Sequence, residues 1–132
     1  MTESEWAEAF AVAWNEVAAP SGMKKCIVRI ATRDPDRRRK IMACRELHGG
    51  LADWKSAFER LADNAWFTGS NSRSWKASLD YVIAPTKRAK IIEDGIMWAE
   101  DREEAATRKR EADEAAAEAE AESARKMERG EW

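Results

Sequence analysis

The sequence predicts an all-α fold, in which a small helical bundle with a short extended linker precedes a long, charged C-terminal helix. Apolar residues recur every three or four positions in several segments, which is the period of a helix that buries one face. Residues 100–132 contain no Leu, Ile, Val or Phe and are rich in Ala, Glu, Arg and Lys, which favour helix. The chain of 132 residues suits one modest core. We therefore expect a helical domain over residues 3–98 and a partly solvated, Ala/Glu-rich helical tail over 99–132.

The first predicted helix covers residues 3–18. Thr2 and Glu5 have the spacing of a capping box, in which each side chain binds the other residue's backbone N–H. Pro20 and Gly22 predict the end of this helix. The apolar residues that follow the cap at helical intervals are Trp6, Phe10, Trp14 and Val17.

The next two segments are predicted from turn signals and caps. Residues 24–32, KKCIVRIAT, alternate in character but have no partner strand in the sequence, so we expect an extended linker. Asp34 can cap a helix, Pro35 suits its first position and Gly49 follows its last turn, which predicts a helix over 35–48. The inward-facing residues of this helix should be Ile41, Cys44 and either Leu47 or His48.

A third helix is predicted from about 51 to 63, where Leu51, Trp54, Phe58 and Leu61 repeat at helical spacing. Gly49 and Gly50 would join it to the preceding helix as an αα-hairpin. A helix-turn-helix would need base-reading polar residues on its outer face, whereas Asp53 and Glu59 would oppose phosphate. A recognition helix is therefore disfavoured.

The segments before the tail predict shorter elements. Residues 75–83 should form a short helix, and residues 86–95 another turn or two with Ile91 and Ile92 buried and Gly95 as its stop. Ile96, Met97 and Trp98 should pack back on the core. The tail itself is predicted to be a solvated helix, and a homo-oligomer or partner contact is the alternative, because alanine makes a weak coiled-coil interface.

Several function classes are disfavoured by composition. No stretch approaches the roughly 20 apolar residues that span a bilayer and the N-terminus is acidic, so we expect a cytoplasmic protein without membrane contact. Cys26 and Cys44 are the only cysteines and His48 the only histidine, so no zinc site is expected and the thiols should be reduced. No set of nucleophile, base and orienting acid is evident, and no Walker-type phosphate loop is present. We expect neither enzyme activity nor a cofactor.

Charge and aromatic residues favour nucleic-acid binding. The net charge is −2, yet residues 21–45 hold nine basic side chains against two acidic ones, and residues 96–132 hold seven against twelve. Cations release counterions from phosphates, and aromatic rings stack on unpaired bases. This pattern predicts weak binding of single-stranded or distorted DNA. The aromatic residues around the loop at 69–74 are alternatively core residues, which we favour for most of them. The candidate binding residues are Arg37, Arg38, Arg39, Lys40, Arg73, Trp75, Lys76, Lys87 and Lys90.

Five motifs follow one another in a consistent order over residues 6–95. They are AWNEV at 13–17, DRRRKIMACRELHGGLADWKSAFERL at 36–61, NAWFTG at 64–69, SWKASLDYVIAP at 74–85 and AKIIEDG at 89–95. This order resembles the C-terminal domain of phage and prophage replication proteins of the replisome-organiser or helicase-loader type. The chain departs from that pattern at Trp66-Phe67, where Phe-Leu is usual, at Tyr81, where Trp is usual, and in EDG, which replaces EG followed by an aromatic residue.

The resemblance implies a role in the initiation of DNA replication in a bacterial host cell. It implies contact with DNA, with the replicative helicase or another replisome protein, or with both. Such proteins usually also carry an N-terminal winged-helix domain, whereas this chain is expected to start with the first helix of the C-terminal unit. The alternative function is a protein-only adaptor or inhibitor of a host protein, in which the basic residues meet an acidic surface.

Overall fold

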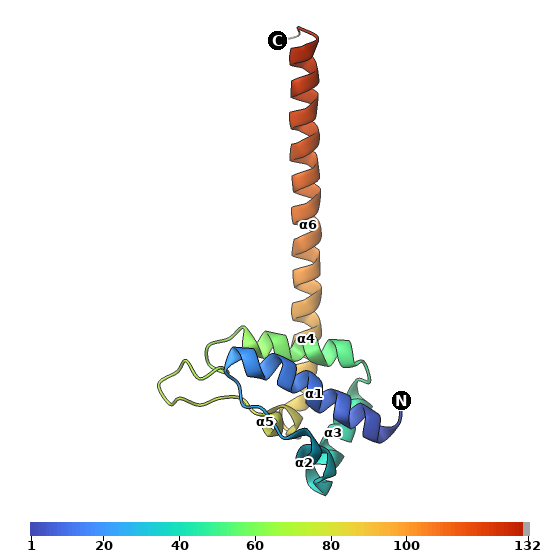
Figure 1. Ribbon diagram of the computed structural model, residues 1–132, viewed down its shortest axis with the longest axis vertical. Coiled ribbons are helices and arrows are strands. Elements are labelled where there is room, and N and C mark those ends of the chain that lie inside the picture. The colour runs from blue at the N-terminus through green and yellow to red at the C-terminus, as the bar shows by residue number, and fades with distance from the viewer. Residues whose placement is uncertain (131–132) are drawn as a thin grey trace. The chain divides into compact units, whose positions relative to one another are not determined.

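The computed structural model describes residues 1–130, and within them the all-α prediction is confirmed: the regular elements are six helices (Figure 1). The helices are α1 (Glu3–Ser21), α2 (Val28–Arg33), α3 (Pro35–Leu47), α4 (Leu51–Ala62), α5 (Leu79–Ile83) and α6 (Arg88–Glu128). The chain divides into two compact units, Met1–Ala99 and a second that begins at Glu100, and α6 runs from the first into the second. No helix in the described part of the chain is both long and apolar enough to cross a membrane.

The start of α1 is held by the predicted capping box. Thr2 Oγ1 accepts from the Glu5 N–H at 3.1 Å, and Glu5 Oε1 accepts from the Thr2 N–H at 3.1 Å. The helix continues through Pro20 to Ser21 and ends at Gly22, whose φ of 91° is left-handed. The end was therefore predicted a few residues early. A proline in the last turn removes only one helical N–H bond, and its effect there is small compared with a mid-helix position.

The core of the first unit is built on aromatic residues of α1 and α4. The Phe10 ring lies 5.2 Å from that of Trp54 and 5.3 Å from that of Phe58, both edge to face, and the Trp14 ring meets Phe58 at 5.2 Å. All four side chains are fully buried. Edge-to-face pairs of this kind add to the stabilisation from buried apolar area. The apolar faces of α1 and α4 are thus buried against each other.

Buried indoles also hold the connecting segments by hydrogen bonds. Trp14 Nε1 donates to the carbonyl oxygen of Lys24 at 2.8 Å, and Trp54 Nε1 donates to that of His48 at 2.6 Å. A buried indole N–H needs an acceptor, so each tryptophan fixes a loop as well as filling the core. The bond from Trp14 to Lys24 fixes the segment that follows α1.

The extended linker predicted over residues 24–32 is only partly extended. Its second half forms α2, because Ala31 packs fully buried in a small helical turn against the core. The first half is extended and is paired with a side chain: Asn15 Nδ2 donates to the Cys26 carbonyl at 2.9 Å, and Asn15 Oδ1 accepts from the Cys26 N–H at 2.8 Å. The alternation of apolar and polar residues over 24–32 was therefore too short to exclude a helix in its second half.

The predicted helix over residues 75–83 begins later, at Leu79. The Ser78 side chain caps α5 by accepting from the Tyr81 N–H, and the residues before it are extended. Lys76 forms an antiparallel bridge with Thr68. The helix prediction was wrong at Trp75 because backbone pairing across the loop competes with helix formation there.

Gly95 is not a helix stop, as the sequence suggested, but a buried position within α6. A Cβ placed on Gly95 would lie 2.4 Å from the Cβ of Ala57, so glycine allows α6 to approach α4 closely. Ile91 and Ile92 are buried as predicted. Ile96 packs against the core, whereas Met97 is 56% exposed and does not, contrary to expectation.

The hairpin between α3 and α4 also resolves the alternatives left open by the sequence. Ile41 and Cys44 are buried as predicted, Leu47 is exposed and His48 is partly buried. His48 Nε2 lies 2.5 Å from Asp53 Oδ2 across the Gly49-Gly50 joint. Both cysteines are free thiols.

Candidate nucleic-acid interface

A groove of about 580 Å³ lies on the first unit, and aromatic and basic side chains line it. Three of its residues carry aromatic rings, four carry cationic groups, and none carries a carboxylate. We call it the aromatic–basic groove. Its lining residues are Lys24, Trp66, Arg73, Ser74, Trp75, Lys76, Tyr81 and Lys87.

Backbone hydrogen bonds join three segments at this groove. The Ala77 N–H donates to the Phe67 carbonyl at 2.8 Å, and the Lys24 N–H donates to the Ala77 carbonyl at 2.9 Å. The bridge between Thr68 and Lys76 extends the same pairing. Lys24 is therefore carried to the 64–78 loop from a distant part of the chain, and the groove combines residues that sequence proximity does not connect.

Asn71 organises the loop between Trp66 and Trp75. Its Nδ2 donates to the carbonyl oxygens of Trp66 at 2.9 Å and Trp75 at 2.8 Å. Its Oδ1 accepts from the N–H groups of Arg73 at 2.9 Å and Trp75 at 3.2 Å. One amide side chain thus satisfies four backbone groups in a loop that lacks regular structure, which is a turn role typical of asparagine.

The aromatic residues of the loop divide into a partly buried set and an exposed one. Phe67, Trp75 and Tyr81 pack against the core, with the Trp75 ring 5.1 Å from that of Tyr81. Trp66 is 45% exposed and its ring lies 5.9 Å from that of Trp75, tilted by 32°. The expectation that most of these rings belong to the core is thus met, and Trp66 is the exposed ring among them.

The cations of the groove are not neutralised by neighbouring acids. Within residues 1–130, no carboxylate lies within ion-pair distance of Lys24, Arg73, Lys76 or Lys87. The Lys87 ammonium lies 5.8 Å from the centroid of the Tyr81 ring. The aliphatic part of the Lys76 side chain packs over Gly69, and a Cβ added to this glycine would lie 3.0 Å from Lys76 side-chain carbons. The φ of Gly69, +93°, also favours glycine at this position. The groove is therefore a site of concentrated positive charge.

The predicted basic residues on α3 are placed differently. Arg37 forms two bonds with the Asp80 carboxylate, at 3.0 and 3.2 Å, and Arg38 donates to Ser4 Oγ at 2.9 Å. Arg39 and Lys40 both pair with Asp36, at 3.4 and 2.9 Å, and the hydrogen bond from Lys40 lowers the pKa of Asp36. Arg37, Arg39 and Lys40 are therefore paired with carboxylates, whereas within the described residues Arg38 bonds only a neutral hydroxyl.

Four of the nine candidate residues, Arg73, Trp75, Lys76 and Lys87, line the aromatic–basic groove together. Lys90 does not line it and pairs with Asp94 at 3.2 Å. Four groove residues were not among the candidates: Lys24, Trp66, Ser74 and Tyr81. Lys24 belonged to the basic run but gave no sign of its contact with Ala77, and Trp66 was one of the loop aromatic residues of which most were expected to be core residues. The position of Trp66 three residues before the polar loop at 69–74 was the one available signal.

No family model, no curated protein and no solved structure matches this chain. The resemblance to phage replication proteins therefore stays a prediction.

Proposed function

We propose that the protein binds single-stranded DNA, or unpaired bases in distorted DNA, in the aromatic–basic groove, and that it serves as a non-enzymatic accessory in phage or prophage DNA replication. The observation that carries the proposal is the exposed Trp66 ring beside four unpaired cations in one groove without a carboxylate. This combination of a stacking surface and phosphate-binding charges is typical of proteins that bind single strands.

The exposed ring favours unpaired bases over duplex DNA. A base stacked on an aromatic side chain contributes roughly 1–3 kcal/mol, and every base has a face that can stack. In a duplex both faces of each base are already covered by its neighbours. Trp66 rests on Trp75, which in turn packs against Tyr81, so the ring is supported from behind and loses little freedom when a base binds.

The replication role and the recruitment of a replicative helicase are supported by the order of the five motifs, and both belong to the proposal. The alternative, a protein-only adaptor, predicts no affinity for DNA. The two functions are therefore separated by direct binding measurements on the purified protein.

The test is fluorescence anisotropy with a labelled oligothymidine at low salt, and with a duplex of equal length. We expect the single strand to bind more tightly than the duplex and Trp66→Ala to weaken binding roughly tenfold, since a lost stack of about 1.4 kcal/mol corresponds to a factor of ten. Leu47→Ala is the matched control, because Leu47 is similarly exposed at 48% but does not line the groove. Absence of binding at low salt, or equal effects of both variants, would contradict the proposal.

A further inference from the structure

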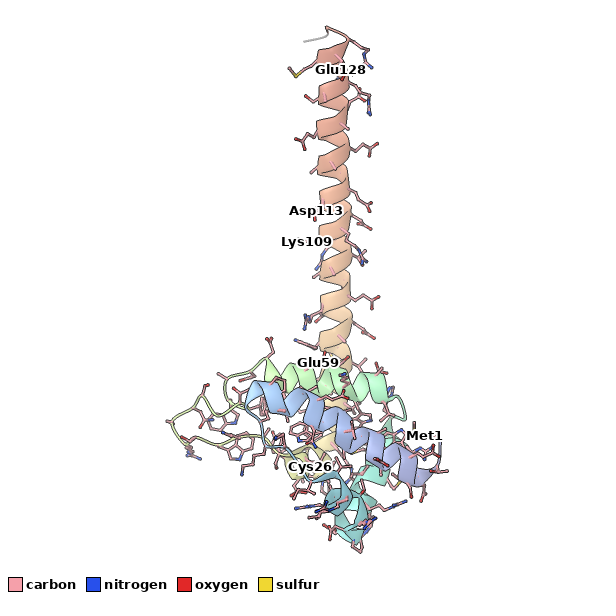
Figure 2. The ribbon with its side chains drawn as sticks, viewed as in Figure 1. Met1, Cys26, Glu59, Lys109, Asp113 and Glu128 are labelled. Atoms are coloured by element: carbon pink, nitrogen blue, oxygen red, sulfur yellow. The ribbon has the colours of Figure 1, made fainter. Side chains whose placement is uncertain are left out.

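A second groove, of about 380 Å³, lies where the segment around α2 meets the start of α5, and we call it the α2 groove. Ile27 and Ile30 line it and are 58% and 48% exposed. The buried Leu79 and the half-buried Cys26 complete its apolar surface, and Figure 2 labels Cys26 on the extended segment that leads into α2. Ile27 and Ile30 stand three residues apart, so a single partner segment can contact both.

The charge around these isoleucines is positive. Lys24 and Lys25 line the groove, and no carboxylate within the described residues pairs with either. The carboxylate that does line it, Asp80, is engaged by Arg37 through two bonds. The segment 24–33 as a whole carries four basic residues and no acidic one. A ligand of this groove must therefore combine apolar side chains with negative charge.

We propose that the α2 groove binds an acidic protein segment that presents aliphatic or aromatic side chains, such as one face of an amphipathic helix rich in Glu and Leu. Apolar side chains of the partner cover Ile27 and Ile30, and its carboxylates pair with Lys24 and Lys25. A protein segment is favoured over a nucleic acid because this groove contains no aromatic ring for a base to stack on, in contrast to the aromatic–basic groove.

The two grooves share one residue. Lys24 lines both the α2 groove and the aromatic–basic groove, so its ammonium cannot serve a carboxylate and a phosphate fully at once. Binding of an acidic segment therefore weakens DNA binding, and DNA weakens binding of the segment by the same factor, as linkage requires. The proposal itself does not depend on DNA binding, since Lys25 and the isoleucines line only the α2 groove.

The test uses a designed probe on the full-length protein. The probe is a fluorescein-labelled helical peptide in which Leu recurs at positions i, i+3, i+4 and i+7 and Glu fills the other positions. A second peptide with Lys in place of every Glu is its control. We expect the acidic peptide to bind and the basic peptide to bind at least tenfold more weakly, and we expect raised salt to reduce the difference.

Variants then locate the bound peptide. The double variant Ile27→Ala/Ile30→Ala should weaken binding about tenfold, whereas Leu47→Ala, an equally exposed apolar residue elsewhere, should change it less than twofold. Lys25→Gln should weaken binding about threefold, and Lys109→Gln, on α6 where Figure 2 labels the residue, should leave it unchanged. Circular dichroism of each variant checks that the helices are retained.

A second readout is internal to the chain. Alkylation of Cys26 should slow when the acidic peptide is bound, while the buried Cys44 stays unreactive in both states. Failure of the acidic peptide to bind, equal binding of the basic peptide, or equal losses for the isoleucine and Leu47 variants would each overturn the proposal. Loss of DNA binding in Trp66→Ala with peptide binding intact would separate the two grooves.

Discussion

The side chain of Asn71 is bonded to both backbone groups of Trp75, donating to its carbonyl at 2.8 Å and accepting from its N–H at 3.2 Å. The same amide donates to the carbonyl of Trp66. Asn71 therefore sets the spacing of two tryptophans whose rings line the aromatic–basic groove, although it does not itself line that groove. It is a positioning residue for the proposed DNA site.

Asn71→Ala should weaken DNA binding about three- to tenfold with little loss of global stability. The substitution removes four hydrogen bonds, each worth about 1 kcal/mol, but the loop can open to water without disturbing α1 or α4. Oligothymidine affinity and urea denaturation measure the two effects. Asn71→Asp keeps the acceptor and loses both donated bonds, so its affinity should fall between those of the other two proteins. Equal DNA affinity of all three would show that the loop geometry does not matter for binding.

The salt dependence of DNA binding should reflect the cations of the groove. Four phosphate contacts on a single strand predict a slope of log affinity against log salt of about −2.8. Arg73→Ala together with Lys76→Gln should make that slope shallower by about 1.4, because two contacts are lost. Neutralising Arg39 and Lys40, which pair with Asp36, should change the salt slope by less than the Arg73 and Lys76 substitutions do. Anisotropy titrations at several salt concentrations decide the point, and a larger effect of the α3 variant would move the DNA site to that helix.

Gly95→Ala should destabilise the protein by about 1–3 kcal/mol, although alanine favours helix over glycine by about 1 kcal/mol. The reason is that the added Cβ would clash both with the Cβ of Ala57 and with its backbone Cα. Ala57→Gly in the same chain should restore little of the loss, because the backbone Cα of residue 57 would still lie 2.5 Å from the added Cβ; urea denaturation of the single and double variants measures this. Stabilisation by Gly95→Ala alone would contradict the close approach of α4 and α6.

Stability should fall in alkaline solution because of Cys44. Burial raises the pKa of this thiol from its usual 9.0 to about 12, an effect that the nearby Arg88 partly opposes. Between pH 9 and pH 12 the Cys44 thiol has lost its proton in the unfolded state but keeps it in the folded state. The stability that the buried neutral thiol contributes is therefore fully present below pH 9 and declines as the pH rises towards 12. At pH 10 the loss of unfolding free energy relative to pH 8 should be greater than in Cys44→Ala, by about 1 kcal/mol. Denaturation of both proteins at the two pH values measures it, and parallel losses would refute it.

Deletion of residues 100–132 should leave the unfolding free energy of the first unit unchanged within about 0.5 kcal/mol. The core residues all precede Glu100, and side chains from 100 to 130 are exposed apart from two that are partly buried.

Light scattering on the full chain and on the same deletion tests whether the tail forms a homo-oligomer. A mass that drops by more than the deleted residues would show that the tail joins copies of the chain.

Local signals in the sequence predicted the helix starts and the buried faces. The capping box of Thr2 and Glu5 and the Asp34-Pro35 start of α3 act within one turn, so they are decided by neighbours three residues away. The apolar period of α4 likewise identified Trp54 and Phe58 as core residues. Predictions were wrong where a short segment depended on a distant contact, as in α2, which is helical because Ala31 packs on the core.

By itself, then, the sequence determined the fold class, the aromatic core and the presence of excess positive charge in the first unit. Only the tertiary structure decided which of those charges are available to a ligand. Arg37 is engaged by Asp80, 43 residues away, whereas Lys24 is brought to the groove through its backbone bond to Ala77. The physical reason is that ion pairs and backbone pairing act over a few ångströms, and distances of that kind between remote residues exist only once the helices have packed.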